Sequence, residues 1–202
     1  MIFKISALVL LAVFYACYFI KMFRQRKKGI KTSQIGKGKT EKTRTIEYLM
    51  SVSTFLVVIA EVTSIICGTT VFPLFLRIIG LIVAVFGVAV FIAAVVTMRD
   101  SWRVGVPEEK KTKIVTTGIF SVSRNPAFLG FDLLYLGILL TFFNPFLLVF
   151  SLFSAIMLHL QTVVVEEPFL REAFGKDYEN YTKSVCRYLG KNKNTKKFLF
   201  MY

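Results

Sequence analysis

Long apolar runs separated by polar segments dominate this chain of 202 residues. A helix that spans a bilayer needs about 20 mainly apolar residues. Runs that approach this length occupy residues 5–20, 48–67, 78–98, 126–143 and 146–165. The pattern predicts an all-α, polytopic membrane bundle of about five transmembrane helices, with a C-terminal helical hairpin and short cytoplasmic helices.

The last two runs form one uncharged stretch that is too long for a single span. No formally charged residue separates Asp132 from Glu166. Asn144-Pro145 divides the stretch, and this dipeptide marks a turn because the residue before a proline is biased away from helix. We therefore expect the two runs to form a tight helical hairpin.

The first run has two interpretations. A secretory signal peptide also begins with a positive residue, here Lys4, ahead of a short apolar stretch. In this chain the strong positive charge follows the run, at Lys21, Arg24, Arg26, Lys27 and Lys28. Because charge in that place opposes secretion, we expect a retained membrane anchor.

The positive charges determine the expected orientation. Of the 26 Lys and Arg residues, 10 lie in residues 21–44, 6 in residues 99–124 and 8 from residue 171 onward. These segments all flank the same side of the predicted spans, so the positive-inside rule places that side in the cytoplasm and the N-terminus outside. The net charge of +14 then follows from membrane topology. It needs no nucleic-acid partner, although basic proteins do gain affinity for phosphate backbones.

These features divide the chain into three regions. Residues 1–100 hold the first three spans and a basic cytoplasmic loop at 21–47. Residues 101–190 hold the last two spans and the candidate cofactor-binding and catalytic segments. Residues 191–202 form a basic tail.

Small residues and cysteines add two narrower expectations. Gly80, Ala84 and Gly87 have the spacing of a close helix contact in the third span, and we favour packing within one subunit over a dimer seam. The three cysteines have no paired or metal-like spacing. We therefore expect neither a disulfide framework nor a metal site.

The segment before the fourth span differs from an ordinary loop. Gly118 permits a backbone turn, and Pro126 suits the first turn of a helix. Such a helix start offers free N–H groups to an anion, and Arg124 just ahead of it is placed to hold a carboxylate. An arginine that serves only topology, at a plain helix start, would give the same pattern.

An acidic pair, Glu166-Glu167, follows the fifth span. Adjacent like charges at a membrane boundary are costly without a cationic partner. We expect that partner to be Arg124 or a positively charged ligand, with a solvated helix end as the alternative. Tyr178 and Tyr181 lie three residues apart on a short helix and can face one partner, although such pairs more often simply pack.

Polar residues inside the spans are functional candidates by default. His159 and Glu166 lie two turns apart on one face of the fifth helix. Asp132 lies near the cytoplasmic end of the fourth span and Glu61 in the outer half of the second. An interhelical hydrogen bond is the alternative role for His159, and we assign Glu61 no catalytic role.

One further set of residues spreads over roughly positions 100–190. Its members are Trp102, Ile114-Val115, Gly118-Ile119-Phe120, Arg124-Asn125-Pro126-Ala127-Phe128-Leu129-Gly130, Glu166-Glu167, Leu170, Phe174-Gly175, Tyr178, Tyr181 and Arg187. In this order and spacing they resemble the isoprenylcysteine carboxyl methyltransferase and phospholipid methyltransferase group of integral membrane enzymes. Each motif alone is weak, and their arrangement across a helical hairpin carries the resemblance.

The resemblance implies S-adenosyl-L-methionine (S-adenosylmethionine) as methyl donor at the cytoplasmic face. It also implies a lipophilic small-molecule, lipid or lipidated acceptor that approaches between helices from the bilayer. The donor-binding residues would be Lys113, Ile114, Val115, Gly118, Phe120, Arg124, Asn125, Pro126, Ala127, Phe128, Glu166, Tyr178 and Tyr181. If a protein base is needed, the candidate catalytic residues are Glu167, His159 and Asp132.

Four positions depart from the family's pattern. Asn125 stands in the place of a His, Phe128 in that of a Tyr, and Thr112 where the family often has a His. Thr162 stands where the prenylcysteine enzymes have an Arg that contacts substrate, which argues against a prenylcysteine carboxylate as acceptor. The amide of Asn125 still offers hydrogen bonds, but it does not titrate near neutral pH as His does.

These observations predict an S-adenosylmethionine-dependent methyltransferase that acts on a lipophilic or membrane-embedded acceptor. A catalytically degenerate relative that serves as a membrane scaffold or lipid-binding protein is the main alternative. A small transporter is a third possibility, suggested by the polar residues in the spans. It is disfavoured because many transporters are built from paired repeats, and no repeat is apparent in this chain.

Overall fold

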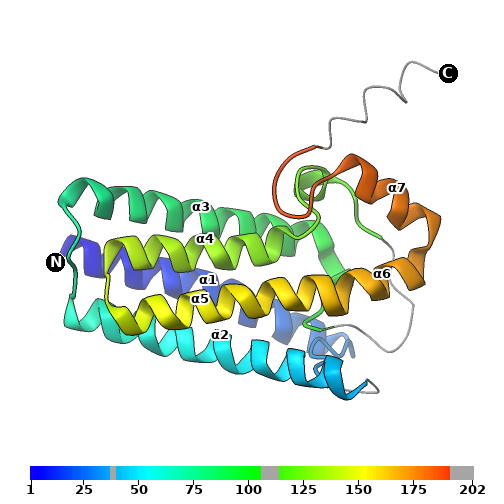
Figure 1. Ribbon diagram of the computed structural model, residues 1–202, viewed down its shortest axis with the longest axis horizontal. Coiled ribbons are helices and arrows are strands. Elements are labelled where there is room, and N and C mark those ends of the chain that lie inside the picture. The colour runs from blue at the N-terminus through cyan, green and yellow to red at the C-terminus, as the bar shows by residue number, and fades with distance from the viewer. Residues whose placement is uncertain (37–39, 106–113, 192–202) are drawn as a thin grey trace.

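The computed structural model describes residues 1–36, 40–105 and 114–191. Five long helices run side by side through the described part of the chain (Figure 1). They are α1 (Ile2–Lys27), α2 (Glu41–Cys67), α3 (Leu74–Met98), α4 (Pro126–Thr141) and α5 (Pro145–Leu160). Four are long and apolar enough to cross a membrane when α5 is taken with its continuation to Phe174, and α4 is a shorter apolar helix. The predicted all-α membrane bundle is confirmed.

The predicted hairpin between the fourth and fifth helices is present. The Asn144 side chain caps α5 by accepting a hydrogen bond of 2.9 Å from the Leu147 N–H, and Pro145 occupies the first turn, where its missing N–H costs nothing. The Asn144 amide also donates to the Ser64 hydroxyl of α2. The turn is therefore fixed to a third helix as well as to its own.

The fifth helix does not end where the apolar run ends. A π-helical segment, η3 (Gln161–Glu166), carries it directly into α6 (Glu167–Phe174). Gly175 then turns the chain with a φ of 51° and begins α7 (Lys176–Ser184). A π-helical turn is rare and often occurs at functional sites. Here it brings the acidic pair to the junction of a spanning helix with the short helices.

Glycines allow α3 and α4 to approach closely. A Cβ atom on Gly137 of α4 would lie 2.5 Å from the Ala84 nitrogen and 2.6 Å from the Gly80 oxygen. One on Gly87 would lie 2.7 Å from the Leu134 nitrogen. Such contacts favour helix association in membranes through close backbone packing. The small-residue stripe of the third helix therefore packs against α4 of the same chain, as predicted.

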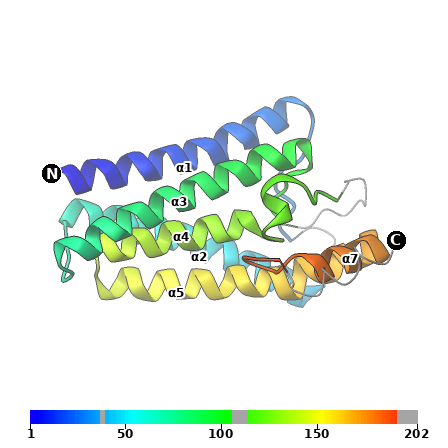
Figure 2. The same ribbon diagram turned by 90° about the horizontal axis from the view of Figure 1, so that it is seen from above.

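The connections of the bundle gather at two opposite ends. The N-terminus, the α2–α3 connection and the α4–α5 turn lie at one end, and the α1–α2 connection, α6 and α7 lie at the other (Figures 1 and 2). The second end, here called the basic end, carries the described parts of all three Lys/Arg-rich segments. At the opposite end, Lys4 donates to the Ile66 carbonyl at 2.6 Å and Arg77 to the Thr141 carbonyl at 3.1 Å. The charges are thus partitioned as the sequence predicts.

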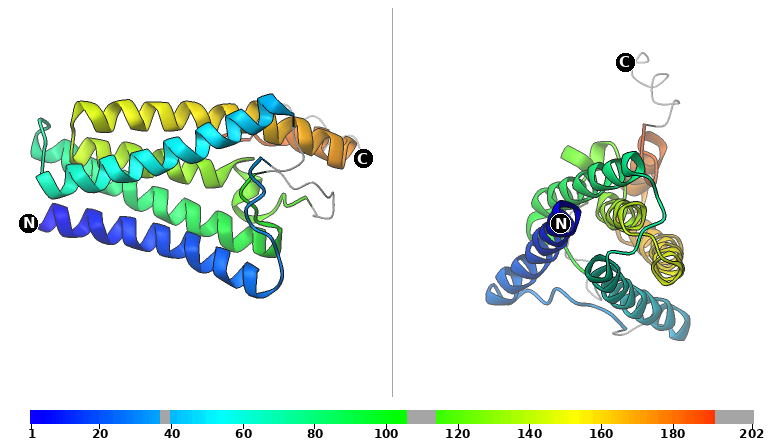
Figure 3. Two further views of the ribbon diagram at one scale, coloured as in Figure 1. Left: turned by 90° about the horizontal axis from the view of Figure 1, so that it is seen from below. Right: turned by 90° about the vertical axis from the view of Figure 1, so that its left-hand side faces the viewer.

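The helices α1 and α2 diverge toward the basic end (Figure 3). By contrast, α3 and α4 stay in close contact along their length. Near the basic end, side chains of both α1 and α2 line one cavity. This arrangement makes room for the candidate site.

Candidate functional site

A cavity of about 670 Å³ lies at the basic end of the bundle. Both segments that stand out in the sequence contribute to its wall. Its lining includes Ile114, Val115, Phe120, Arg124, Asn125, Ala127 and Phe128 from the first segment, and Glu166, Phe169, Leu170, Phe174, Tyr178 and Tyr181 from the second. The structure therefore brings together residues that the sequence only suggested should meet.

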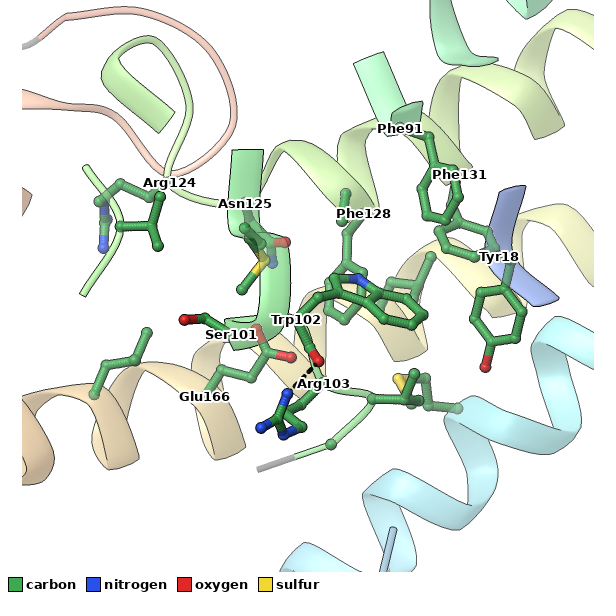
Figure 4. Close-up of a pocket in the computed structure, with 18 of the residues that line it drawn as sticks. Tyr18, Phe91, Ser101, Trp102, Arg103, Arg124, Asn125, Phe128, Phe131 and Glu166 are labelled. Atoms are coloured by element: carbon green, nitrogen blue, oxygen red, sulfur yellow. Dashed lines mark hydrogen bonds between the residues drawn. The ribbon is translucent and has the colours of Figure 1, made fainter. Parts of the chain in front are cut away.

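The cavity continues from this polar part into an apolar part between the spanning helices. In the close-up, Tyr18, Phe91 and Phe131 lie on the far side of Trp102 from Arg124 and Glu166 (Figure 4). Phe19 of α1 and Phe55 of α2 also line it, and they are 47% and 66% exposed on the bundle surface. Residues of the cavity wall thus reach the apolar outer surface of the bundle between α1 and α2.

Trp102 divides the two parts and is held firmly. Its carbonyl accepts a hydrogen bond of 2.9 Å from the amide of Gln25, a buried residue of α1. The Gln25 oxygen in turn accepts one of 2.8 Å from the Thr32 hydroxyl. The indole ring packs edge-on against Tyr18, with ring centroids 5.4 Å apart. Trp102 is therefore a rigid wall of the cavity.

The loop that carries Phe120 is fixed by a glycine and a tyrosine. Gly118 has a φ of 60° and begins the short 3-10 helix η2 (Gly118–Ser121). The Tyr181 hydroxyl donates to the Phe120 carbonyl at 2.6 Å. Burial raises the pKa of Tyr181, which keeps its hydroxyl protonated as a donor. Gly118 thus shapes the wall, whereas Phe120 and Tyr181 line the cavity itself.

A C-terminal hairpin, residues 185–191, covers the start of α4. The N–H groups of Arg124 and Asn125 donate to the carbonyls of Cys186 and Arg187, each at 3.1 Å. These two donors are therefore not available to an anion, contrary to the simplest expectation for a helix start. Since Pro126 has no N–H, those of Ala127 and Phe128 are the first in α4 that a ligand can use.

The two glutamates of the acidic pair have different surroundings, and Glu167 is the one held by arginines. Arg187 binds Glu167 with two hydrogen bonds, of 2.7 and 3.0 Å, and Arg124 lies 3.1 Å from the same carboxylate. The carboxylate in turn raises the pKa of Arg187. A buried carboxylate needs such partners to offset its desolvation. The expected partner of the acidic pair was either Arg124 or a positively charged ligand. For Glu167 it is Arg124, together with Arg187.

Arg124 uses its other donors inside the protein as well. Its Nε atom donates to the Val185 carbonyl and its Nη1 atom to the Tyr178 hydroxyl, both at 3.0 Å. The guanidinium therefore joins the start of α4 to α6, α7 and the C-terminal hairpin. Its main role in the structure is to hold the cavity wall together.

Glu166 lies on the cavity side of the pair and is drawn beside Ser101 and Arg103 (Figure 4). Asn125 also lines the cavity, and its amide donates to the Thr162 hydroxyl at 2.5 Å. Thr162 does not line the cavity. In this chain it serves to orient Asn125.

The three candidate catalytic residues lie outside the cavity wall. The His159 Nδ1 atom pairs with the Tyr188 hydroxyl at 2.6 Å on the exposed side of α5. Asp132 is partly buried, and its Oδ1 atom has no hydrogen-bond partner in the described structure. Glu167 is engaged by two arginines. Catalytic roles for these residues stay predictions, and Lys113 lies outside the described residues.

Sequence patterns placed Ser101 and Arg103 in the candidate cofactor-binding region 101–190 but gave neither a role in the site, and they did not indicate the α1 and α2 residues at all. These residues line the cavity because α1 and α2 diverge and the chain after α3 folds beneath them. Only Arg103, a charged residue directly after Trp102, carried a local signal that could have been noticed.

Comparison with known proteins places these features in a family context. The model of the family described as phospholipid methyltransferase matches residues 75–177. A probable protein-S-isoprenylcysteine O-methyltransferase of Oryza sativa subsp. japonica is 28% identical over 113 residues, which is 55% of this chain and 59% of that protein. The protein-S-isoprenylcysteine O-methyltransferase of Dictyostelium discoideum is 30% identical over 109 residues, 53% of this chain and 46% of that protein.

The protein-S-isoprenylcysteine O-methyltransferase of Saccharomyces cerevisiae is 35% identical over 78 residues, 39% of this chain and 33% of that protein. Across these relatives, the similarity spans between 33% and 59% of the relative's length.

Proposed function

The chain belongs to the phospholipid methyltransferase family, and from this premise we propose that it transfers a methyl group from S-adenosylmethionine to a lipophilic or membrane-embedded acceptor at the cytoplasmic membrane face. One observation carries the proposal. A single cavity joins a polar part, lined by both family-like segments, to an apolar part between the spanning helices. Such a cavity suits one polar and one lipophilic reactant.

The polar part fits the proposed donor. The volume of the whole cavity, about 670 Å³, falls within the range of about 300–1,000 Å³ that is usual for small-molecule sites. Glu166 offers a carboxylate, and the rings of Phe120, Phe128 and Tyr178 offer faces that attract cations. When bound, S-adenosylmethionine supplies an electrophilic methyl group on a positively charged sulfur. Glu166 and the aromatic wall would hold these positive charges.

The donor-binding set predicted from the sequence divides into two groups. Ile114, Val115, Phe120, Ala127, Phe128, Glu166, Tyr178 and Tyr181 line the cavity and would contact the donor. Arg124 and Asn125 also line it, but their side chains are fixed by protein partners. We propose that these two residues position the wall, while Gly118 and Pro126 set the course of the backbone.

The apolar part would hold the acceptor. Methyl transfer requires that the acceptor atom be aligned with the methyl group and that water be excluded. The rigid Trp102, together with Tyr18 and Phe131, would orient a lipophilic tail entering between α1 and α2. No protein base is required for an acceptor already in its reactive form. An acceptor that must also lose a proton would need one, and Glu167, His159 and Asp132 remain the candidates.

Labelled methyl incorporation tests the proposal. Cells with and without the protein are supplied with methyl-labelled methionine, and their membranes are separated into lipid and protein fractions. We expect a labelled species that depends on the protein, and purified protein should bind S-adenosylhomocysteine. The proposal is wrong if the purified protein binds neither S-adenosylmethionine nor S-adenosylhomocysteine at millimolar ligand, whatever lipids it binds.

A further inference from the structure

Arg103 is a cation in the cavity wall that forms no salt bridge with the described residues; the nearby Asp100 carboxylate is paired with Lys28 at 2.8 Å. The Arg103 Nη1 atom donates to the carbonyls of Asp100 and Trp102, at 2.6 and 2.8 Å. Within residues 1–36, 40–105 and 114–191, it forms no ion pair. Within the same residues its Nε and Nη2 atoms have no hydrogen-bond partner, so they can donate to a ligand.

The backbone around Arg103 is pinned on both sides. The Trp102 carbonyl is held by Gln25 at 2.9 Å. The Val104 N–H donates to the Thr32 carbonyl at 3.0 Å, and the Gln34 N–H donates to the Val104 carbonyl at 2.8 Å. With its own Nη1 atom anchored as well, the guanidinium is preorganised. A fixed binding group costs less ordering when a ligand arrives.

Arg124, the other cation of the described cavity wall, is bound to protein partners. Arg124 gives its donors to Glu167, Tyr178 and Val185. Of the two arginines among the described lining residues, Arg103 is therefore the one that forms no salt bridge with a protein carboxylate. An anionic group that enters the cavity would meet Arg103 as its available partner.

Arg103 also lies at the boundary between the two parts of the cavity. It is drawn between Glu166 and the group of Tyr18, Phe91 and Phe131, directly beneath Trp102 (Figure 4). An anion held there would adjoin the apolar part, while Glu166 favours a positively charged group on the other side. The cavity thus offers binding groups of opposite sign to its two reactants.

We propose that Arg103 is a specificity-determining residue of the acceptor site, where it binds a carboxylate or phosphate group next to the acceptor's lipophilic tail. The inference rests on the proposed function, because it assigns the apolar part of the cavity to the acceptor. The planar guanidinium matches both anions through paired hydrogen bonds. Such charge-assisted bonds are roughly twice as strong as neutral ones. The protein should therefore prefer anionic amphiphiles to neutral ones of the same shape.

Three probes with one farnesyl tail test the preference. They are N-acetyl-S-farnesylcysteine with its carboxylate, the corresponding carboxamide, and farnesyl monophosphate. Purified protein, Arg103→Gln and Arg103→Lys are titrated with each probe and with S-adenosylhomocysteine. We expect the wild type to bind an anionic probe at least about tenfold more tightly than the carboxamide. Arg103→Gln should lose that difference, and Arg103→Lys should retain part of it.

Donor binding separates the possible outcomes. Arg103→Gln should bind S-adenosylhomocysteine within about twofold of the wild type, a change too small for the loss of a charge-assisted bond. If Arg103→Gln weakened binding of S-adenosylhomocysteine as much as binding of the anionic probes, Arg103 would hold the donor's carboxylate, and the assignment would be overturned. Equal binding of charged and neutral probes by the wild type would also overturn it. Whichever anionic probe binds more tightly shows whether the acceptor's anionic group is a carboxylate or a phosphate.

The matched control is Arg26→Gln. Arg26 is an exposed residue of α1 at the same end of the bundle and does not line the cavity. Its replacement removes one positive charge, so it reports any general effect of charge on anionic probes. One further outcome separates the two proposals. If the wild type binds no donor but prefers anionic probes, and only Arg103→Gln removes that preference, the methyltransferase proposal fails while Arg103 remains an anion-binding residue.

Discussion

Glu166 and Glu61 are both carboxylates on apolar helices, yet their surroundings differ. Glu166 lines the polar part of the cavity, whereas Glu61 is fully buried in the bundle and lines no part of it. We expect Glu166→Gln to weaken S-adenosylmethionine binding by at least about tenfold, because a charge-assisted contact is lost. Glu61→Gln should leave the affinity nearly unchanged. Calorimetric titration of both purified variants measures the difference, and equal affinities would remove Glu166 from the site.

Arg187 provides a second prediction at the scale of one residue. Its two hydrogen bonds to Glu167 lie in a partly buried place. Arg187→Gln should lower the free energy of unfolding by about 1–3 kcal/mol, since the buried carboxylate loses its best partner. Arg187→Lys should have an intermediate effect, because lysine keeps the charge but not the paired geometry.

Thermal unfolding in detergent measures both variants. Arg171→Gln is the control, because Arg171 is exposed on α6 and forms no ion pair in the described part of the chain. If Arg171→Gln and Arg187→Gln lowered the unfolding temperature equally, the bidentate contact would contribute nothing beyond general charge.

At the scale of helices, the glycine contact between α3 and α4 gives the clearest prediction. A side chain on Gly137 would collide with the backbone of Gly80 and Ala84. Gly137→Leu should therefore force the helices apart and destabilise the protein by about 1–3 kcal/mol or more. Val85→Leu, a change on the half-exposed side of α3, should have little effect. The measurement is the fraction of folded protein after graded heating, and equal losses would contradict close packing.

The helices themselves could be predicted because their signals are local. Apolar runs, the Asn144-Pro145 turn and the small-residue stripe each lie within a few turns of chain, and the structure shows all of them. The π-helical continuation of α5 into α6 could not be predicted. The apolar run ends before it, and no local rule distinguishes a π turn from the end of a helix.

The site was harder to predict because its geometry depends on contacts between distant segments. The structure brings the segments of Gly118, Arg124 and the acidic pair to the same end of the bundle, where Arg124 and Glu166 line one cavity. Arg124 pairs with Glu167, one of the two expected outcomes, but the sequence did not indicate that the C-terminal hairpin would accept hydrogen bonds from the N–H groups of Arg124 and Asn125. Arg103 and the walls of α1 and α2 depend on how whole helices diverge, which no single segment encodes.

At the scale of the whole molecule, the partition of charge predicts a measurable topology. The basic end should face the cytoplasm, because Lys and Arg are retained there during membrane insertion. Thr70 lies in the α2–α3 connection at the opposite end, and Lys31 lies at the basic end. In a background with Cys17, Cys67 and Cys186 replaced by Ser, Thr70→Cys should react with an impermeant maleimide on intact cells.

Lys31→Cys should react only after the membrane is opened. The two variants form an internal pair, since each reports one side of the same protein at similar expression. This orientation would bring the cavity mouth to the side where cytoplasmic S-adenosylmethionine is available, while the gap between α1 and α2 faces lipid. Labelling of Lys31→Cys on intact cells, with Thr70→Cys protected, would reverse the topology. It would also require the methyl donor to reach the cavity from outside the cell, which would count against the proposed reaction.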